Sequence, residues 1–72
     1  MLNISIYSPY ITLGQFLKYA SIITNGGEAK FFLSEHEVVI NNEVDNRRGR
    51  KLYPGDVVDI DGSQYLICSH EN

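Results

Sequence analysis

The sequence predicts a small α+β domain with an N-terminal strand, two short helices and then a small, mostly antiparallel sheet. Three observations lead to this prediction. Residues 2–7 alternate between apolar and polar side chains, which is the period of a half-buried strand. Residues 13–20 and 29–36 repeat apolar side chains at helical spacing. Short apolar runs separated by turn residues fill the remaining chain up to residue 68.

The first helix has a well-marked start at Thr12. Thr12 followed by Gln15 is a capping-box pattern, in which each side chain accepts a hydrogen bond from the backbone of the other. Ile11 and Phe16 are placed to form the accompanying hydrophobic staple. Glycines interrupt helices, so we expect residues 25–27, Asn-Gly-Gly, to separate this helix from the next.

The second helix is expected to start with another capping box, formed by Asn25 and Glu28. Phe31 projects away from the predicted core face, so it either packs under the N-terminal strand or stands exposed. His36 lies at the helix end and is expected in left-handed backbone, which histidine adopts more often than most residues. The predicted core face of this helix consists of Ala29, Phe32, Leu33 and His36.

Turn residues divide the second half of the chain into strands. Asn41 and Asn42 tolerate the left-handed backbone of a tight hairpin. Residues 53–56 read Tyr-Pro-Gly-Asp, which suits a type II turn, and residues 61–62 read Asp-Gly, a strong hairpin signal. The strands expected between these turns are residues 38–40, 43–45, 57–60 and 64–68.

Length and composition restrict the architecture. A chain of 72 residues gains only ~3–5 kcal/mol from its core, so we expect one domain over residues 1–72. The apolar runs are far shorter than the ~20 residues of a membrane helix, so no membrane segment is expected. Cys68 is the only cysteine; we expect it to be a buried small hydrophobe and the protein to be cytoplasmic.

The sequence contains no recognisable catalytic or metal-binding motif. His36 and His70 are far apart in the chain, and one cysteine with two separated histidines does not make a zinc site. Gly26 and Gly27 open a helix, but the lysine and hydroxyl residue of a phosphate-binding loop do not follow. We therefore expect a protein that is not an enzyme and that binds neither a metal nor another cofactor.

Four of the six Lys and Arg residues gather within residues 47–51, although the formal net charge is −3. Charges beyond about 8–10 Å are largely screened at physiological salt, so this cluster can create a positive field on an acidic protein. Arginine binds phosphate through bidentate hydrogen bonds. The alternative is a solvated loop whose charges pair with Glu43 or Asp45. Composition alone favours neither interpretation.

Two strings of residues carry a family resemblance: GGEAK at residues 26–30 and RRGRKLYPGD at residues 47–56. With these strings, residues 12–60 resemble the RNA-binding domain first seen in ribosomal protein S-four, the αL motif, and its stand-alone YaaA-like bacterial branch. That family has two helices followed by a strand hairpin. The other matches to its signature are Ala29, Phe32-Leu33, Val38, Ile40-Asn41 and Gly55-Asp56.

The chain departs from the family pattern at three places. His36 and Asn42 replace glycines, and both residue types can adopt left-handed geometry. Asn25-Gly26 replaces the Ser-Arg pair that commonly opens helix two, so one arginine that often contacts RNA is missing. Lys30, directly after the matching alanine, remains.

The resemblance implies binding of structured RNA by helix two and by the loop of basic residues 47–51, called the basic loop below. We expect ribosomal RNA during ribosome assembly, with transfer RNA as the second choice. Gln15 and the N-terminal donor groups of helix two would extend the surface. Tyr53 and Phe31 could stack on bases, but packing is the default for an aromatic residue beside strands. The expected RNA-binding residues are Lys18, Lys30, Arg47, Arg48, Arg50 and Lys51.

A protein-interaction module is the competing hypothesis. The exposed edge of a small sheet, with Phe31 nearby, could recruit a strand of a ribosomal or enzyme partner. The acidic remainder of the chain could also face a basic ribosomal protein. Neutralising residues 47–51 distinguishes the two hypotheses, since it should abolish RNA binding and leave protein docking intact.

Overall fold

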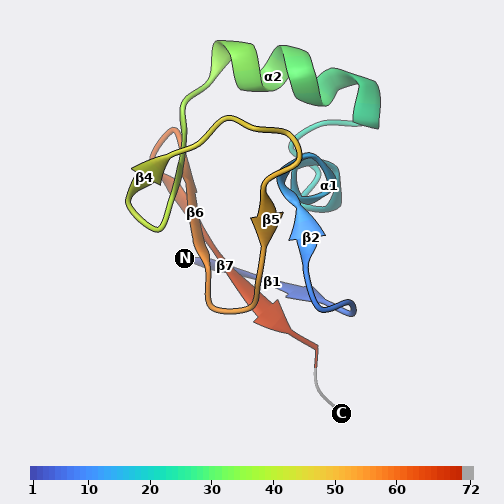
Figure 1. The fold of residues 1–72 in the computed structure, drawn as a ribbon, viewed down its shortest axis with the longest axis vertical. Coiled ribbons are helices and arrows are strands. Elements are labelled where there is room, and N and C mark those ends of the chain that lie inside the picture. Colours follow the sequence, from blue (N-terminus) through green and yellow to red (C-terminus); the bar gives the residue numbers. More distant parts are fainter. Residues whose placement is uncertain (71–72) are drawn as a thin grey trace.

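The computed structural model describes residues 1–70 and confirms the predicted α+β fold (Figure 1). The helical elements are α1 (Leu13–Tyr19), a short 3-10 helix η1 (Gly26–Glu28) and α2 (Ala29–Glu35). The strands are β1 (Leu2–Ile6), β2 (Ile11–Thr12), β3 (Val38–Ile40), β4 (Glu43–Val44), β5 (Lys51–Leu52), β6 (Val57–Ile60) and β7 (Ser63–Ser69).

Five strands form one sheet in the order β1-β7-β6-β3-β4. The neighbours are antiparallel except β1 and β7, which run parallel with Leu2 opposite Tyr65 and Ile6 opposite Ser69. The sheet is therefore mostly antiparallel, as predicted. A separate two-stranded ribbon, β2 with β5, places Thr12 opposite Lys51.

A single apolar cluster joins the sheet to both helices. Phe16 of α1 is fully buried, and its ring packs edge-on against Tyr65 of β7 at a centroid distance of 5.3 Å. Burying a large apolar side chain stabilises a fold by roughly 1.5–3 kcal/mol, so these contacts set where the helices lie on the sheet. The other buried members are Ile6, Leu13, Leu17, Ile23, Ala29, Leu33, Val38, Ile40, Leu52, Val58, Ile60 and Ile67.

The predicted capping box at the start of α1 is present. The Thr12 hydroxyl accepts from the Gln15 N–H at 3.2 Å, and the Gln15 side-chain oxygen accepts from the Thr12 N–H at 2.8 Å. These bonds satisfy two backbone donors that would otherwise lack partners at the helix start.

The end of α1 falls earlier than the glycine break that we expected to close it. Ser21 adopts a left-handed φ of 62°. The Ser21 N–H donates to the Lys18 carbonyl at 3.0 Å, and the Ile22 N–H donates to the Leu17 carbonyl at 2.9 Å. This pair of bonds is the Schellman arrangement, which usually has glycine at the left-handed position. Because a serine occupies this position, the sequence did not indicate that the helix ends here.

The start of the second helical segment differs in part from the expectation. Asn25 caps it by accepting from the Gly27 N–H at 3.0 Å. The main partner of Glu28 is Thr24, whose N–H and hydroxyl donate to the carboxylate at 2.8 and 3.1 Å. These donors lower the pKa of Glu28. The cap at Asn25 was therefore predicted correctly, whereas the side chain of Glu28 reaches one residue further back.

His36 does not take the left-handed conformation that we expected. Its φ is −129° and its ψ is 144°, so the backbone is already extended as it leaves α2 for β3. The ring stacks on Phe32 at a centroid distance of 4.1 Å, and Nδ1 lies 2.7 Å from a carboxylate oxygen of Asp61. His36 thus leaves α2 in extended backbone, and its ring contacts Phe32 and Asp61.

The turn predictions are confirmed. Asn41 and Asn42 have φ values of 51° and 70°, and the Asp61-Gly62 turn has φ values of 51° and 87°. Gly55 has a φ of 99°, and the Asp56 N–H donates to the Tyr53 carbonyl at 2.9 Å, as in a type II turn.

Three further expectations can be compared with the structure. Phe31 is 70% exposed, so its side chain stands in solvent and does not pack under the N-terminal strand. Cys68 is half-buried rather than fully buried. Of the helices in residues 1–70, none has the length and apolar character needed to cross a bilayer. Residues 71–72 of the expected domain lie outside the described part of the chain.

Replacing Thr12 with alanine should destabilise the fold by about 1 kcal/mol, because the Gln15 N–H loses its acceptor. Denaturant-induced unfolding measures this difference. Ser63→Ala, which removes a hydroxyl from an exposed position of β7, is the control and should leave the midpoint nearly unchanged. Equal midpoints for the two variants would contradict the role assigned to the cap.

Candidate nucleic-acid interface

The loop between β4 and β5 is fixed to the first turn of α1. The Leu13 N–H donates to the Arg50 carbonyl at 2.7 Å, and the Gly14 N–H donates to the Arg48 carbonyl at 2.9 Å. The first N–H groups of a helix lack partners within the helix, so they are available for such bonds. The loop therefore takes up donors that could otherwise bind an external anion.

The other end of the loop is attached to α2 and β3. The Asn46 side-chain amide donates to the Leu33 carbonyl at 3.2 Å and accepts from the Val38 N–H at 3.4 Å. The Asp45 N–H also donates to the Val38 carbonyl at 3.0 Å. The sequence analysis missed Asn46, since an asparagine in a polar loop carries no distinctive signal.

A glycine allows the loop to approach α1 closely. A Cβ atom at Gly14 would lie 2.8 Å from Cγ of Arg48 and 3.4 Å from its carbonyl oxygen. Real Cβ contacts are longer than the first of these distances, so a larger residue would displace the Arg48 side chain. Gly14 is a second positioning residue that the sequence analysis did not identify.

Two of the predicted cations are paired with Asp45. Nη2 of Arg47 and Nη1 of Arg50 lie 2.7 and 2.8 Å from the same carboxylate oxygen. The carboxylate is only 10% exposed, while the side chains of Arg47 and Arg50 are 75% and 26% exposed. Hydrogen bonds from Arg47 are the largest cause of the pKa of Asp45, which lies far below its usual range. The same contacts raise the pKa of Arg47. The pairing with Asp45 that the solvated-loop alternative expected is therefore present for these two side chains.

Lys51 lies in β5 rather than in the loop where the sequence analysis placed it. Its ammonium nitrogen is 4.9 Å from the centroid of the Tyr10 ring, which is within cation–π range. This side chain therefore lies beside the Tyr10 ring, just before β2.

Three predicted cations from different elements line two adjoining hollows that share Arg48. The loop runs between α2 and the start of α1, which brings these elements together (Figure 1). The first hollow contains Lys18 of α1, and the second contains Lys30 of α2. The first is lined by Thr12, Gly14, Gln15, Lys18, Gly26, Ala29, Arg48 and Gly49. The second is lined by Lys30, Leu33, Ser34, Asn46 and Arg48.

Lys18, Lys30 and Arg48, called the basic triad below, are all exposed. Within residues 1–70, the ion pairs involve His36, Asp61, Asp45, Arg47 and Arg50, and none involves a member of the triad. Among the described residues, the triad thus offers charge to a ligand without an ion-pair partner, as Lys51 does beside Tyr10.

The N-terminal donors of the second helix are already used within the chain. The Gly27 N–H donates to the Asn25 side chain at 3.0 Å, and the Glu28 N–H donates to the Asn25 carbonyl at 3.1 Å. These two donors therefore have acceptors within the chain, contrary to the expectation that they extend the binding surface. Gln15 does line the first hollow, although its side-chain oxygen belongs to the capping box.

The described residues show no arrangement that could hold a metal ion. No three His, Cys, Asp or Glu side chains of residues 1–70 gather in a group suited to metal binding.

Comparison with known proteins decides the family. The S4 domain family matches residues 4–68. The chain is a member of the S4 domain family. It is also 70% identical over 59 residues to a protein of Bacillus subtilis (strain 168) named "Probable ribosome maturation protein RlbA", and the match covers 82% of this chain and 83% of that protein. No solved structure matches the chain. The S4 domain assignment confirms the resemblance found in the sequence.

Asp45→Asn should lower the stability of this S4 domain and loosen its loop, because the amide cannot neutralise Arg47 and Arg50. The pKa of Asp45 is lower in the folded chain, so its contribution is complete above about pH 4 and is lost as pH falls toward the folded-state value. Thermal melts of wild type and variant should therefore differ near pH 7 and converge toward pH 2. A difference that stays constant over this range would contradict the ion-pair explanation.

Proposed function

We propose that this protein binds structured RNA without catalysing a reaction, and that its partner is ribosomal RNA in ribosome maturation. The observation that carries the proposal is the basic triad, set around two hollows on a loop that backbone hydrogen bonds hold in place. Membership of the S4 domain family and the name of the Bacillus subtilis relative support it. A ribosomal partner would make the protein cytoplasmic.

The triad suits a folded RNA better than an extended one. Double-helical RNA is recognised mainly by its shape and by its phosphates and 2′-hydroxyls. Cations from α1, α2 and the loop surround the hollows, so they can contact phosphates on more than one side of an inserted RNA backbone. Since the loop is already ordered, little conformational entropy is lost on binding.

The six predicted cations are expected to contribute unequally. Lys18, Lys30 and Arg48 bind phosphate directly in this proposal. Arg47 and Arg50 must share their guanidinium groups with Asp45, so their gain on binding RNA is smaller. Arg47 is exposed and can contact a phosphate while it remains paired with Asp45. Arg50 is less exposed, so its main role is to hold the loop in place through Asp45.

Ribosomal particles are the first place to test the proposal. Wild-type protein should travel with them in a sucrose gradient of a cell lysate at low salt and be released at high salt. The Lys18→Gln, Lys30→Gln, Arg48→Gln triple variant should stay at the top of the gradient at low salt. If the triple variant travels with the particles like the wild type, a protein contact rather than the triad holds it there.

Salt dependence measures how many phosphates the protein contacts. With about four phosphates neutralised, log K against log salt should have a slope of roughly −3 to −4 in binding to purified ribosomal RNA. Arg48→Gln should reduce the steepness by about 1. Arg47→Gln is the matched comparison and should have a smaller effect, because Asp45 already shares that charge. A slope near zero for the wild type would refute an electrostatic site.

A further inference from the structure

A pair of tyrosines extends the surface beyond the basic triad. Side chains alternate along β2 and β5, so Ile11 and Leu52 point to the core while their neighbours point outward. Tyr10 and Tyr53 therefore face each other on the outside of the ribbon. Their ring centroids are 5.6 Å apart with a tilt of 44°, and the residues are 37% and 48% exposed.

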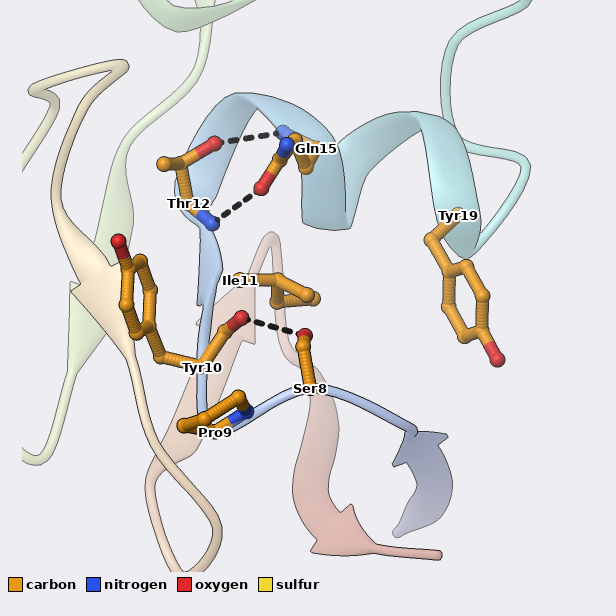
Figure 2. Close-up of a pocket in the computed structure, with 7 residues that line it drawn as sticks. All are labelled: Ser8, Pro9, Tyr10, Ile11, Thr12, Gln15 and Tyr19. Carbon is orange, nitrogen blue, oxygen red and sulfur yellow. Dashed lines mark hydrogen bonds between the residues drawn. The ribbon is translucent and has the colours of Figure 1, made fainter.

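One contact to its backbone and one to its ring position Tyr10. The Ser8 hydroxyl donates to the Tyr10 carbonyl at 2.7 Å, and Pro9 between them restricts the backbone (Figure 2). Lys51 lies on the same outer side of the ribbon and places its ammonium group 4.9 Å from the Tyr10 centroid. Two accessible aromatic rings beside a cation are the groups that bind a nucleotide, because bases stack on the rings and phosphate attracts the ammonium group.

The tyrosine pair is continuous with the basic triad. Tyr10 lines a hollow with Thr12 and Gln15, and these two residues also line the hollow that contains Lys18 and Arg48. Figure 2 shows Thr12 and Gln15 at one end of this hollow, and the Tyr10 ring on the side of β2 opposite Ile11 and Tyr19. Thr12 and Lys51 pair in the ribbon and lie on its outer side with both tyrosines, so Thr12 links the tyrosine pair to the hollow that contains Lys18 and Arg48.

The nearby acid is turned toward the backbone. Asp56 accepts from the Tyr53 N–H at 2.8 Å and from the Asn41 side-chain amide at 3.0 Å. One carboxylate oxygen therefore has its donor in the turn and the other has its donor in Asn41 after β3, and Lys51 supplies the uncompensated charge of the ribbon. The chemistry of this end of the surface favours an anionic, aromatic ligand.

We propose that Tyr10, Tyr53 and Lys51 form a second RNA contact, which takes an unpaired nucleotide extending from the structured RNA bound at the triad. This inference rests on the proposed function. The base stacks on the exposed tyrosine rings, and the Lys51 ammonium group moves from Tyr10 to the adjoining phosphate. The surface thereby distinguishes a helix that continues into a single strand from one that ends bluntly.

The test uses a ribosomal RNA hairpin that wild-type protein retains at low salt, prepared with a blunt end or with a short single-stranded adenosine extension. Fluorescence anisotropy of the labelled hairpins gives the two dissociation constants. Wild type should bind the extended hairpin about 5- to 150-fold more tightly, as expected for stacking of one base. The Tyr10→Leu, Tyr53→Leu variant should bind both hairpins with the affinity that wild type has for the blunt one.

Three variants separate stacking from other effects. The Tyr10→Phe, Tyr53→Phe variant keeps the rings and should keep the preference for the extension. Phe31→Leu removes an exposed aromatic ring from α2 and should also keep it. Arg48→Gln should weaken binding of both hairpins by the same factor. Circular dichroism of the leucine variant confirms that it is folded.

The outcomes distinguish the two proposals. Equal affinity of wild type for the blunt and extended hairpins overturns the second contact and leaves the triad in place. A preference that survives in the leucine variant also overturns it. If wild type retains no ribosomal RNA hairpin at low salt, the proposed function fails, and the second contact fails with it.

Discussion

Two peptide hydrogen bonds between the start of α1 and the basic loop, from Leu13 to Arg50 and from Gly14 to Arg48, organise the surface of this protein. They satisfy helix donors that would otherwise need water, and they fix the backbone from which the arginines project. Because Leu13 is fully buried, the loop is connected through this one helical turn to the apolar core. The placement of the cations is thus a property of the fold and does not depend on the flexible side chains themselves.

The chain is acidic overall, yet it gathers its positive charge in one region. Asp45 makes this arrangement tolerable, because it lies within the loop and offsets the repulsion between Arg47 and Arg50. Of the four remaining cations, Lys18, Lys30 and Arg48 come from three different elements and share two hollows, and Lys51 lies beside Tyr10. Net charge is therefore a poor guide to the ligand of a small protein, whose local field depends on how its charges are distributed.

Local chemistry determined what could be predicted from the sequence. The cap at Thr12, the turn at Asn41-Asn42 and the glycine at position 55 each depend on a few neighbouring residues, and the structure has all three. The helix end at Ser21 and the bridge made by Asn46 depend on partners that the local sequence does not indicate. For the same reason, the sequence showed that cations cluster at residues 47–51 but not which of these charges have partners within the chain.

The parallel pairing of β1 with β7 has a consequence for how the chain folds. Leu2 and Tyr65 become neighbours although most of the chain lies between them. Such long-range pairing is entropically costly and tends to form late, whereas the β6–β7 hairpin needs only a two-residue turn. Without β1, one side of β7 has no strand partner. An unpaired side of this kind is an open template for a strand of another molecule, and the pairing with β1 closes it.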